Sequence, residues 1–401
     1  MPNPTGRLPF AAAWLVLGIL AAPAWAQQPG GFNPQGMARE ALGKPFVGVT
    51  TDGTPRAGLF EIAPTGVSAA PVVEAARDFL AALDAPRREK IGFAVGDEAW
   101  RNWANIHRFP REGVSLAEMT EAQRQAAYAL LQASLSTAGY RTSRDIMRLN
   151  HHLGELVSNF DAYGEHLYWF AIFGEPSGTA PWGWQIEGHH LIVNYFVLGD
   201  QVVMTPTFMG SEPVSAASGK YAGTSVLQPE QDRALAFMRS LPPDQQAAAR
   251  IRPAKSRGEN LAEMFKDDVV IPFAGVRAAE LGPQHRAALL ELIGLYVGNL
   301  RDGHAEVKME EVREHLEETR FAWIGEVGED AVFYYRIHSP VILIEFDHQG
   351  PIALDGPRGT PTRRHIHTVV RTPNGGDYGR DLLRQHHLAH PHGPEPEDPP
   401  G

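Results

Sequence analysis

The sequence predicts an α+β protein in which a mainly antiparallel sheet is flanked by helices and the chain folds as a single large domain. Stretches with helical spacing and stretches with strand character come in clusters and do not alternate strictly. Such clusters favour an antiparallel sheet over a doubly wound or barrel α/β fold. In addition, Gly328-Glu329-Asp330 lies between two strand-like stretches and predicts a hairpin, which joins antiparallel neighbours.

Helices are expected where apolar residues recur every three or four positions. Ser115 and Glu118 form a candidate capping box, and the apolar stripe that follows continues to Gly139. A second helix is expected to begin near Thr142 or Ser143. Further helices are expected at 71–83, 229–249, 283–300 and 307–318. Strands are expected at 166–173, 186–197, 201–206, 320–327, 331–338, 341–347 and 364–371.

The length and composition are those of one domain with a substantial core. The chain has 401 residues, of which 43% are hydrophobic. No repeat of fixed period divides it, so residues 46–386 are expected to form the single domain. Residues 27–45 are Gly/Pro-rich and are expected to be a flexible leader. Residues 387–401 are rich in His, Pro and acidic residues and predict a disordered tail.

Residues 1–26 have the pattern of a secretory signal peptide. Arg7 precedes an apolar run from Phe10 to Ala22, and Ala24-Trp25-Ala26 is a small-x-small cleavage motif. An uncleaved anchor is the alternative, but the run is short against the ~20 residues of a membrane span. The mature protein is therefore expected to be exported, either periplasmic or secreted, with no stable membrane insertion after cleavage.

The net charge and the absence of cysteine limit which classes of partner and which metal ligands are possible. The formal net charge of −11 argues against nucleic acid as a main partner, and a small polar or anionic substrate is expected instead. No oligomeric state is indicated. The chain has no cysteine but 17 histidines. Any metal ion must therefore be held by His, Asp or Glu, which suits zinc, copper, manganese or non-haem iron.

His365 and His367 are the sharpest candidates for a metal site. They lie two apart in a strand-like run, so both imidazoles point to one face, where one divalent ion can bridge them. The alternative is a pair of partly exposed histidines on a half-buried strand. The Gly-rich turn that follows carries Arg371 and Asp377, which favours a ligand-binding role.

Glu187, His189 and His190 form a second candidate group. In a regular strand Glu187 and His189 share a face, whereas His190 points the other way unless Gly188 introduces a bulge. The alternative is an aromatic cluster that packs around a buried, hydrogen-bonded histidine.

Glu345 and Asp347 repeat the spacing of two after four apolar residues. Such a pair can bind metal, act as a general base or hold the far nitrogen of a metal-bound imidazole. A salt bridge to Arg336, Arg363 or Arg364 is the alternative.

Three longer motifs contain these candidate residues. They are Pro181-Trp182-Gly183-Trp184-Gln185-x-Glu187-Gly188-His189-His190-Leu191, Ile344-Glu345-Phe346-Asp347 and His365-x-His367-x-x-x-Arg371-x-Pro373-Asn374-Gly375-x-Asp377-Tyr378-Gly379. Together, over roughly residues 70 to 387, the chain resembles the domain-of-unknown-function family numbered 3500 (DUF3500). The resemblance implies a single full-length domain that is often exported, and it implies no metal, substrate or reaction.

The leading hypothesis is an exported metalloenzyme. His189, His365 and His367 are expected to hold the ion, zinc in the first place, and His190 or His386 is a possible further ligand. Three imidazoles leave an open coordination position for water or substrate.

The remaining candidates would then act on the substrate. Glu187 or Glu345 is the expected general base, and Arg371 and Asp377 are the expected contacts of a polar or anionic substrate group. Hydrolysis is the first expectation for the reaction. A copper- or iron-dependent oxidoreductase is the close alternative, and a periplasmic ligand-binding protein without turnover is the rival of a different class.

Overall fold

The computed structural model describes residues 32–390, so the expected signal peptide lies outside the described residues. The α-helices are α1 Pro34–Leu42, α2 Ala70–Ala82, α3 Ala85–Ile91, α4 Glu121–Ser134, α5 Thr137–Val157, α6 Gln228–Ser240, α7 Pro243–Ala249, α8 Pro283–Val297, α9 Asp302–Glu314 and α10 Arg380–Ala389. The strands are β1 Gly92–Phe93, β2 Val114–Ser115, β3 Tyr168–Phe173, β4 Trp182–Gly188, β5 Leu191–Leu198, β6 Gln201–Val203, β7 Thr207–Ser211, β8 Arg250–Arg252, β9 Val276–Arg277, β10 Arg320–Gly325, β11 Phe333–His338, β12 Leu343–His348 and β13 Ile366–Arg371.

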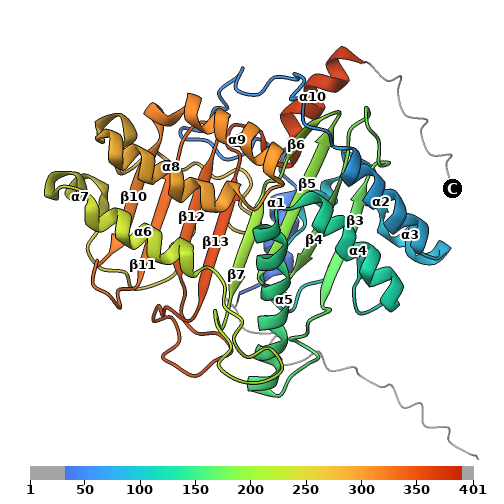
Figure 1. Ribbon diagram of the computed structural model, residues 1–401, viewed down its shortest axis with the longest axis horizontal. Helices are drawn as coiled ribbons and strands as arrows, with labels where there is room; N and C mark the ends of the chain where they lie inside the picture. The colour runs from blue at the N-terminus through green and yellow to red at the C-terminus, as the bar shows by residue number, and fades with distance from the viewer. Residues whose placement is uncertain (1–31, 391–401) are drawn as a thin grey trace, which may run out of the picture.

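These strands form one open, mostly antiparallel sheet (Figure 1). Their order is β1-β3-β4-β5-β7-β13-β12-β11-β10-β8, with β2, β6 and β9 paired to β3, β5 and β10. The pairs β1–β3 and β8–β10, at the two edges, are parallel. The prediction of an α+β fold with a mainly antiparallel sheet in one domain is therefore confirmed.

Two antiparallel meanders meet in the middle of the sheet. The first runs through β3, β4 and β5, and the second through β10, β11, β12 and β13. Strand β7 joins them, because Met209 lies opposite Leu191 of β5 while Gly210 lies opposite His367 of β13. The turn between β4 and β5 and the start of β13 are thus brought to the same end of the sheet.

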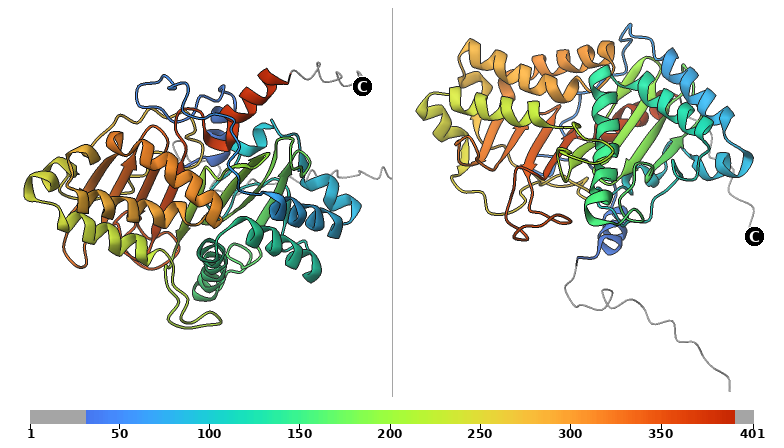
Figure 2. Two further views of the ribbon diagram at one scale, coloured as in Figure 1. Left: turned by 45° about the horizontal axis from the view of Figure 1, so that its top comes forward. Right: turned by 60° about the horizontal axis from the view of Figure 1, so that its bottom comes forward.

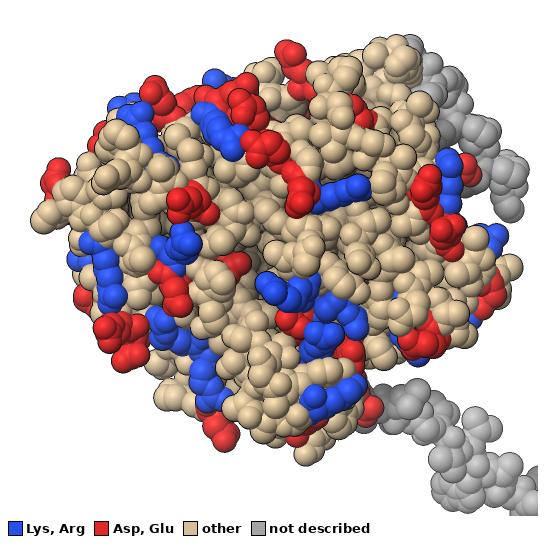
Figure 3. All heavy atoms as spheres, in the orientation of Figure 1, with Lys and Arg blue, Asp and Glu red and all other residues tan. Residues whose placement is uncertain are grey.

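One face of the sheet is apolar and is covered by helices. Thr368 lies opposite Phe346 of β12 and Met209 of β7, so these three residues share this face. Helices α2, α4 and α5 cover one half of it, and α6, α8 and α9 cover the other half (Figures 1 and 2). Buried apolar side chains of the two layers form the main core. Acidic and basic side chains are interspersed on the surface above it (Figure 3).

The opposite face, here called the second face, carries charged residues. Asp347 lies opposite His367, and Arg336 lies opposite Glu345. Glu187 lies opposite Ile192 of β5, which lies opposite Phe208 of β7, so Glu187 shares this face too. Helix α1, seen behind the strands in Figure 1, covers the second face together with residues 97–113, residues 253–272 and the segment that enters α10.

Ser115 and Glu118 form the predicted pair of hydrogen bonds, but they do not cap a helix. Ser115 and Glu118 do exchange hydrogen bonds, with the Ser115 N–H donating to Glu118 Oε2 over 2.9 Å, but they form a turn at the end of β2. The capping box of α4 is made by Thr120 and Gln123. Helix α5 begins earlier than expected, because Ser136 caps its first turn.

The expected flexible leader contains helix α1. The side chain of Asn33 accepts a hydrogen bond from the Gly36 N–H at the start of the helix. At its other end, Arg101 donates to the carbonyl oxygens of Ala41 and Lys44. The expectation of a flexible leader rested on Gly/Pro composition and did not include this helix or its contact with the distant Arg101.

The expected tail also begins too early. Helix α10 runs to Ala389, and its Leu382 and Leu383 pack against Phe196 of β5. Residues beyond 390 lie outside the described range. Within residues 32–390, no helix combines the length and the apolar character that a bilayer span requires.

A buried ion pair on the second face allows the contribution of this face to stability to be measured. Lys255 Nζ lies 2.6 Å from Asp347 Oδ1, and both side chains are fully buried. Lys255→Met removes the cation and leaves the carboxylate buried, so it should lower the free energy of unfolding by about 3–5 kcal/mol. The control Lys90→Met removes an exposed pair with Glu118 and should cost at most about 1 kcal/mol. Urea unfolding measures both, and equal small losses would contradict the structural role of the pair.

Candidate metal centre

Three imidazoles from distant parts of the chain meet at one point. Nε2 of His365 lies 3.0 Å from Nε2 of His367 and 3.2 Å from Nε2 of His190. The Nε2 atoms of His190 and His367 are also 3.2 Å apart. All three residues are buried. In the part of the chain that the structure describes, they form a group whose ligand atoms are close enough to hold one metal ion.

A strand and a turn position these rings. His367 lies in β13 and His365 directly before it, so the spacing of two directs both to one side. His190 is the second residue of the two-residue turn between β4 and β5, and it has a left-handed φ of 65°. A non-glycine residue rarely adopts this conformation, which costs roughly 1–3 kcal/mol and is concentrated at functional sites.

Gly210 of β7 makes room for this arrangement. Its N–H donates to the His190 carbonyl oxygen over 2.8 Å, which docks the turn on the sheet. It also lies directly opposite His367. A Cβ at this position would lie 2.7 Å from the Ile366 carbonyl oxygen and 3.2 Å from Cδ2 of His367. A larger residue would therefore displace β13 and the ring that it carries.

Hydrogen bonds to the far ring nitrogens set the tautomers. Nδ1 of His365 lies 2.7 Å from the Gly350 carbonyl oxygen, and Nδ1 of His367 lies 2.7 Å from Oε1 of Glu263. Because carbonyl and carboxylate oxygens accept, both Nδ1 atoms carry hydrogen, which leaves Nε2 of each ring as the atom available to bind a metal ion. One proton can bridge only one pair of the three Nε2 atoms, whereas one metal ion satisfies all three.

The dimensions and the charge state both suit a metal ion. Zinc–nitrogen bonds of ~2.0–2.1 Å in a tetrahedral site place the ligand atoms roughly 3.3 Å apart, close to the separations in this group. Burial, together with the neighbouring histidines, lowers the pKa of His190 and of His365 well below the ordinary value. These two rings are therefore neutral, the form that binds metal. Three protein ligands leave a fourth position open.

His189 and His386, which the sequence-based hypothesis places among the ligands, lie outside this group. The ring of His189 stacks on that of His190 with centroids 3.9 Å apart, and its Nδ1 lies 2.8 Å from Oδ1 of Asn150. His386 lies in α10, where its ring contacts other histidines at the end of the helix. The turn thus directs His190, and not His189, to the centre.

Arg371 holds the irregular segment that carries Glu263. Its Nε donates to the Ala262 carbonyl oxygen over 3.0 Å, and its Nη2 donates to that of Glu263 over 3.1 Å. Its Nη1 lies 2.6 Å from Oδ1 of Asp267 and 3.2 Å from Oδ2 of Asp377. Arg371 and Asp377 are fully buried and are engaged in these ion pairs, which the sequence-based expectation of substrate contacts did not include.

Glu345 and Asp347 face the same segment from β12. Glu345 accepts hydrogen bonds from the backbone N–H groups of Leu261 and Ala262 and from the Tyr334 hydroxyl, the last over 2.6 Å. Asp347 is engaged in the buried ion pair described above. Both carboxylates therefore fix the segment. The oxygens of Glu345 already accept hydrogen bonds, which the expectation of a general base at this position did not include.

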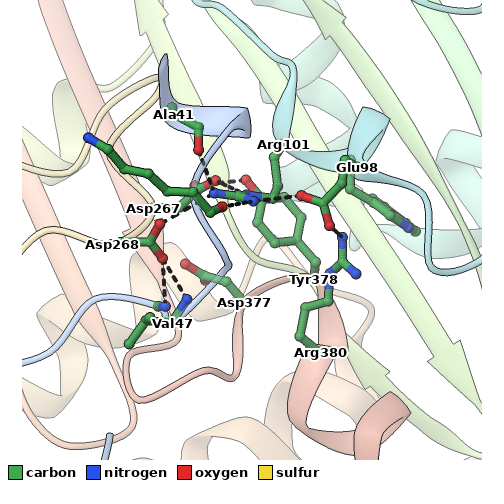
Figure 4. Close-up of polar contacts among 12 residues, drawn as sticks. Ala41, Val47, Glu98, Arg101, Asp267, Asp268, Asp377, Tyr378 and Arg380 are labelled. Carbon is green, nitrogen blue, oxygen red and sulfur yellow. Dashed lines mark hydrogen bonds and ion pairs between the residues drawn. The ribbon is translucent and has the colours of Figure 1, made fainter. Parts of the chain in front are cut away.

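Arg101 ties the N-terminal part of the chain to the same segment (Figure 4). Its Nε lies 2.9 Å from Oδ2 of Asp267, and its other guanidinium nitrogens reach Glu98 and Asp268. The Tyr378 hydroxyl donates to Oδ1 of Asp267 over 3.0 Å. Asp267 thus receives two arginines and a phenol in a fully buried network.

Glu187 belongs to a separate ion pair. Its Oε1 lies 3.3 Å from Nε of Arg111, and both side chains are buried. Burial raises the pKa of Glu187 to about 8 against the attraction of Arg111, and burial likewise lowers the pKa of Arg111. Glu187, an expected general base, is therefore already paired with a cation.

The chain matches the family described as "Protein of unknown function (DUF3500)" over residues 65–380, most of its length. It belongs to the DUF3500 family. The resemblance seen in the sequence motifs is thereby confirmed, and the matched span of this DUF3500 chain contains all three converging histidines. Comparison with curated proteins and with solved structures finds no match. The chemistry of the site therefore has to be argued from its geometry.

Two groups that support the histidines were missed by sequence reasoning. Glu263 lies in an irregular segment without periodic pattern and is 104 positions from His367. Gly350 contributes only its backbone carbonyl oxygen. Neither contribution leaves a signal in the local sequence, because tertiary contacts alone bring these groups to the rings.

Glu187 gives this DUF3500 protein a specific pH dependence of stability. Its folded-state pKa of about 8 lies above the ordinary value of 4.5, so the folded state retains a proton that the unfolded state releases. The resulting stabilisation is fully present below pH 4.5 and is lost as the pH rises through 8. From pH 5 to 8, the wild type should lose up to about 1.4 kcal/mol of unfolding free energy per pH unit relative to Glu187→Gln.

Urea unfolding at several pH values measures this difference. Glu89→Gln, at an exposed position of α3, is the matched control and should follow the wild-type curve. Parallel pH curves for the wild type and Glu187→Gln would contradict the raised pKa.

Proposed function

We propose that this DUF3500 protein is an exported metal-dependent enzyme whose ion, zinc in the first place, is held by His190, His365 and His367. The supporting observation is the convergence of three Nε2 atoms at 3.0 to 3.2 Å. The bonds from Gly350 and Glu263 are of the kind that orients metal-binding histidines. Export rests on the signal pattern of residues 1–26.

Hydrolysis is the reaction that this arrangement supports best. Zinc with three histidine ligands keeps one position for water and lowers the pKa of that water to about 7, which supplies a nucleophile at neutral pH. The reaction then needs no separate carboxylate to generate the nucleophile, and Glu187 and Glu345 are engaged elsewhere. An ion bound by neutral ligands gives the site a positive charge, which favours a polar or anionic substrate group.

The all-imidazole ligand set also suits copper and iron, and with them an oxidoreductase. Metal analysis of the protein purified from its exporting host separates the two proposals. Stoichiometric zinc supports the hydrolase, whereas stoichiometric copper or iron supports the oxidoreductase. A protein without affinity for any of these metals would sink both and favour a ligand-binding protein without turnover.

Metal affinity should depend on the three converging histidines. His365→Ala and His367→Ala each remove a ligand, so each should lower zinc affinity by more than the ~100-fold that the loss of an orienting partner can cause. His386→Ala, outside the group, should leave the affinity unchanged. Competition titration against a chelator measures the affinity, and circular dichroism checks folding. Loss of folding in the His→Ala variants together with no zinc binding by the wild type would support a structural network instead.

Glu263 should tune the metal centre without being a ligand. Glu263→Ala removes the acceptor that orients His367 and should lower zinc affinity about 10–100-fold with the stoichiometry kept at one. Glu263→Gln retains an acceptor oxygen and should lose less. The same titration tests the order wild type, Gln, Ala, with Glu89→Gln as control. Equal affinities in all four proteins would remove Glu263 from the site.

A further inference from the structure

A cavity of about 170 Å³ lies on the helix-covered face of the sheet, opposite to the face of the histidines. Met209 and Thr368 form part of its floor, Tyr296 of α8 and Lys308 of α9 form part of its wall, and Phe60 lies near its rim. Met209 and Thr368 lie on the face opposite to His367, so the sheet separates this cavity from the metal centre.

The size and the walls of the cavity fit a small apolar body. Side chains such as Met209, Leu227, Val297 and Ile342 line it. An apolar cavity of roughly 150 Å³ is sufficient to bind benzene. A ligand with one six-membered ring therefore fits the enclosed part.

One buried carboxyl group that lines this cavity has an oxygen without a partner. Glu230, in the first turn of α6, is 8% exposed, and its Oε2 has no hydrogen-bond partner. Burial raises its pKa to about 7. The titratable groups that face it are the phenols of Tyr296 and Tyr335, and burial raises the pKa of both well above the ordinary value, so they stay neutral. A buried carboxyl oxygen without a partner is costly, and a ligand with a donor removes that cost.

The charges around the cavity are complementary to a cation. Glu61, Glu311 and Asp381 line it in addition to Glu230, against the single ammonium of Lys308. Of these, Asp381 already pairs with Arg384, whose Nη2 lies 2.6 Å from its Oδ1. Lys308 is already engaged, because its Nζ lies 2.9 Å from Oε1 of Glu311 and donates to the Val341 carbonyl oxygen. His304, which also lines the cavity, adds no charge at neutral pH, because burial lowers its pKa.

We propose that this cavity is a second binding site of the protein, for a small organic amine whose ring-sized apolar body fills the enclosed space and whose ammonium group pairs with Glu230. The site is independent of the metal centre. A neutral alcohol can fill the same space but brings no charge, and an anion is disfavoured by the carboxylates of the lining. The buried carboxyl thus selects the amine.

Benzylamine, benzyl alcohol and phenylacetate are matched probes, because they share the ring and differ in the charged group. At pH 8, where Glu230 is largely ionised, benzylamine should bind at least about tenfold more tightly than benzyl alcohol, and phenylacetate should bind most weakly. At pH 6, benzylamine has to displace the proton of Glu230. Its affinity should then fall about tenfold, with release of close to one proton per molecule bound.

Isothermal titration calorimetry in two buffers of different ionisation enthalpy measures both the affinity and the released proton. Glu230→Gln should abolish the preference for benzylamine and the proton release, and it should leave benzyl alcohol affinity within about twofold. Glu61→Gln, which removes the same charge at an exposed position of the rim, is the matched control and should retain both.

The outcomes that would overturn the proposal are distinct. Equal binding of benzylamine and benzyl alcohol by the wild type would leave an apolar cavity without selectivity. Equal losses in Glu230→Gln and Glu61→Gln would reduce the effect to the general charge of the surface. Absence of benzylamine binding at millimolar concentration, measured on the folded wild type, would remove the site altogether.

Discussion

The structure depends on the pairing of buried charges where residues 253–272 pack on the second face of the sheet. This segment contains no helix or long strand, so its backbone groups find partners among side chains of the sheet. Arg371 and Glu345 together bind its carbonyl and N–H groups, and Asp267 of the segment receives both Arg371 and Arg101. A charge left alone in such surroundings costs about 3–5 kcal/mol, so the members of the network hold one another in place.

The same network positions one of the three converging histidines. Arg371 fixes the backbone of Glu263, and Glu263 in turn fixes the ring of His367. Arg371 and Glu345, to which sequence reasoning gave roles towards the substrate, thus hold the segment that carries Glu263. The sheet then has two distinct sides: a group of three converging histidines on the charged side and a cavity lined by a buried carboxyl group on the helix-covered side.

Much of the fold was predictable because it follows from periodicity. The strands that carry Glu345 and His367 were found from their apolar runs, and the period of two correctly places Glu345 with Asp347 on one face. The expected strand at 186–197 was wrong, because β4 ends at Gly188 and a turn separates it from β5. Short β7 was missed, because Thr207–Ser211 contains few apolar residues. The central position of β13 also has no local signal, since it depends on pairing with β7 across more than 150 residues.

The sequence by itself determined that His365 and His367 share a side, because a strand repeats every two residues. It also determined that a metal ion here would be held without thiolates, because the chain has no cysteine. Only the tertiary structure decided that the third imidazole is His190 and not His189, because a left-handed turn, which spacing does not reveal, rotates it towards the centre. Likewise, only the tertiary structure decided that Glu187 and Glu345 have partners, because burial and long-range pairing cannot be predicted from the neighbouring residues.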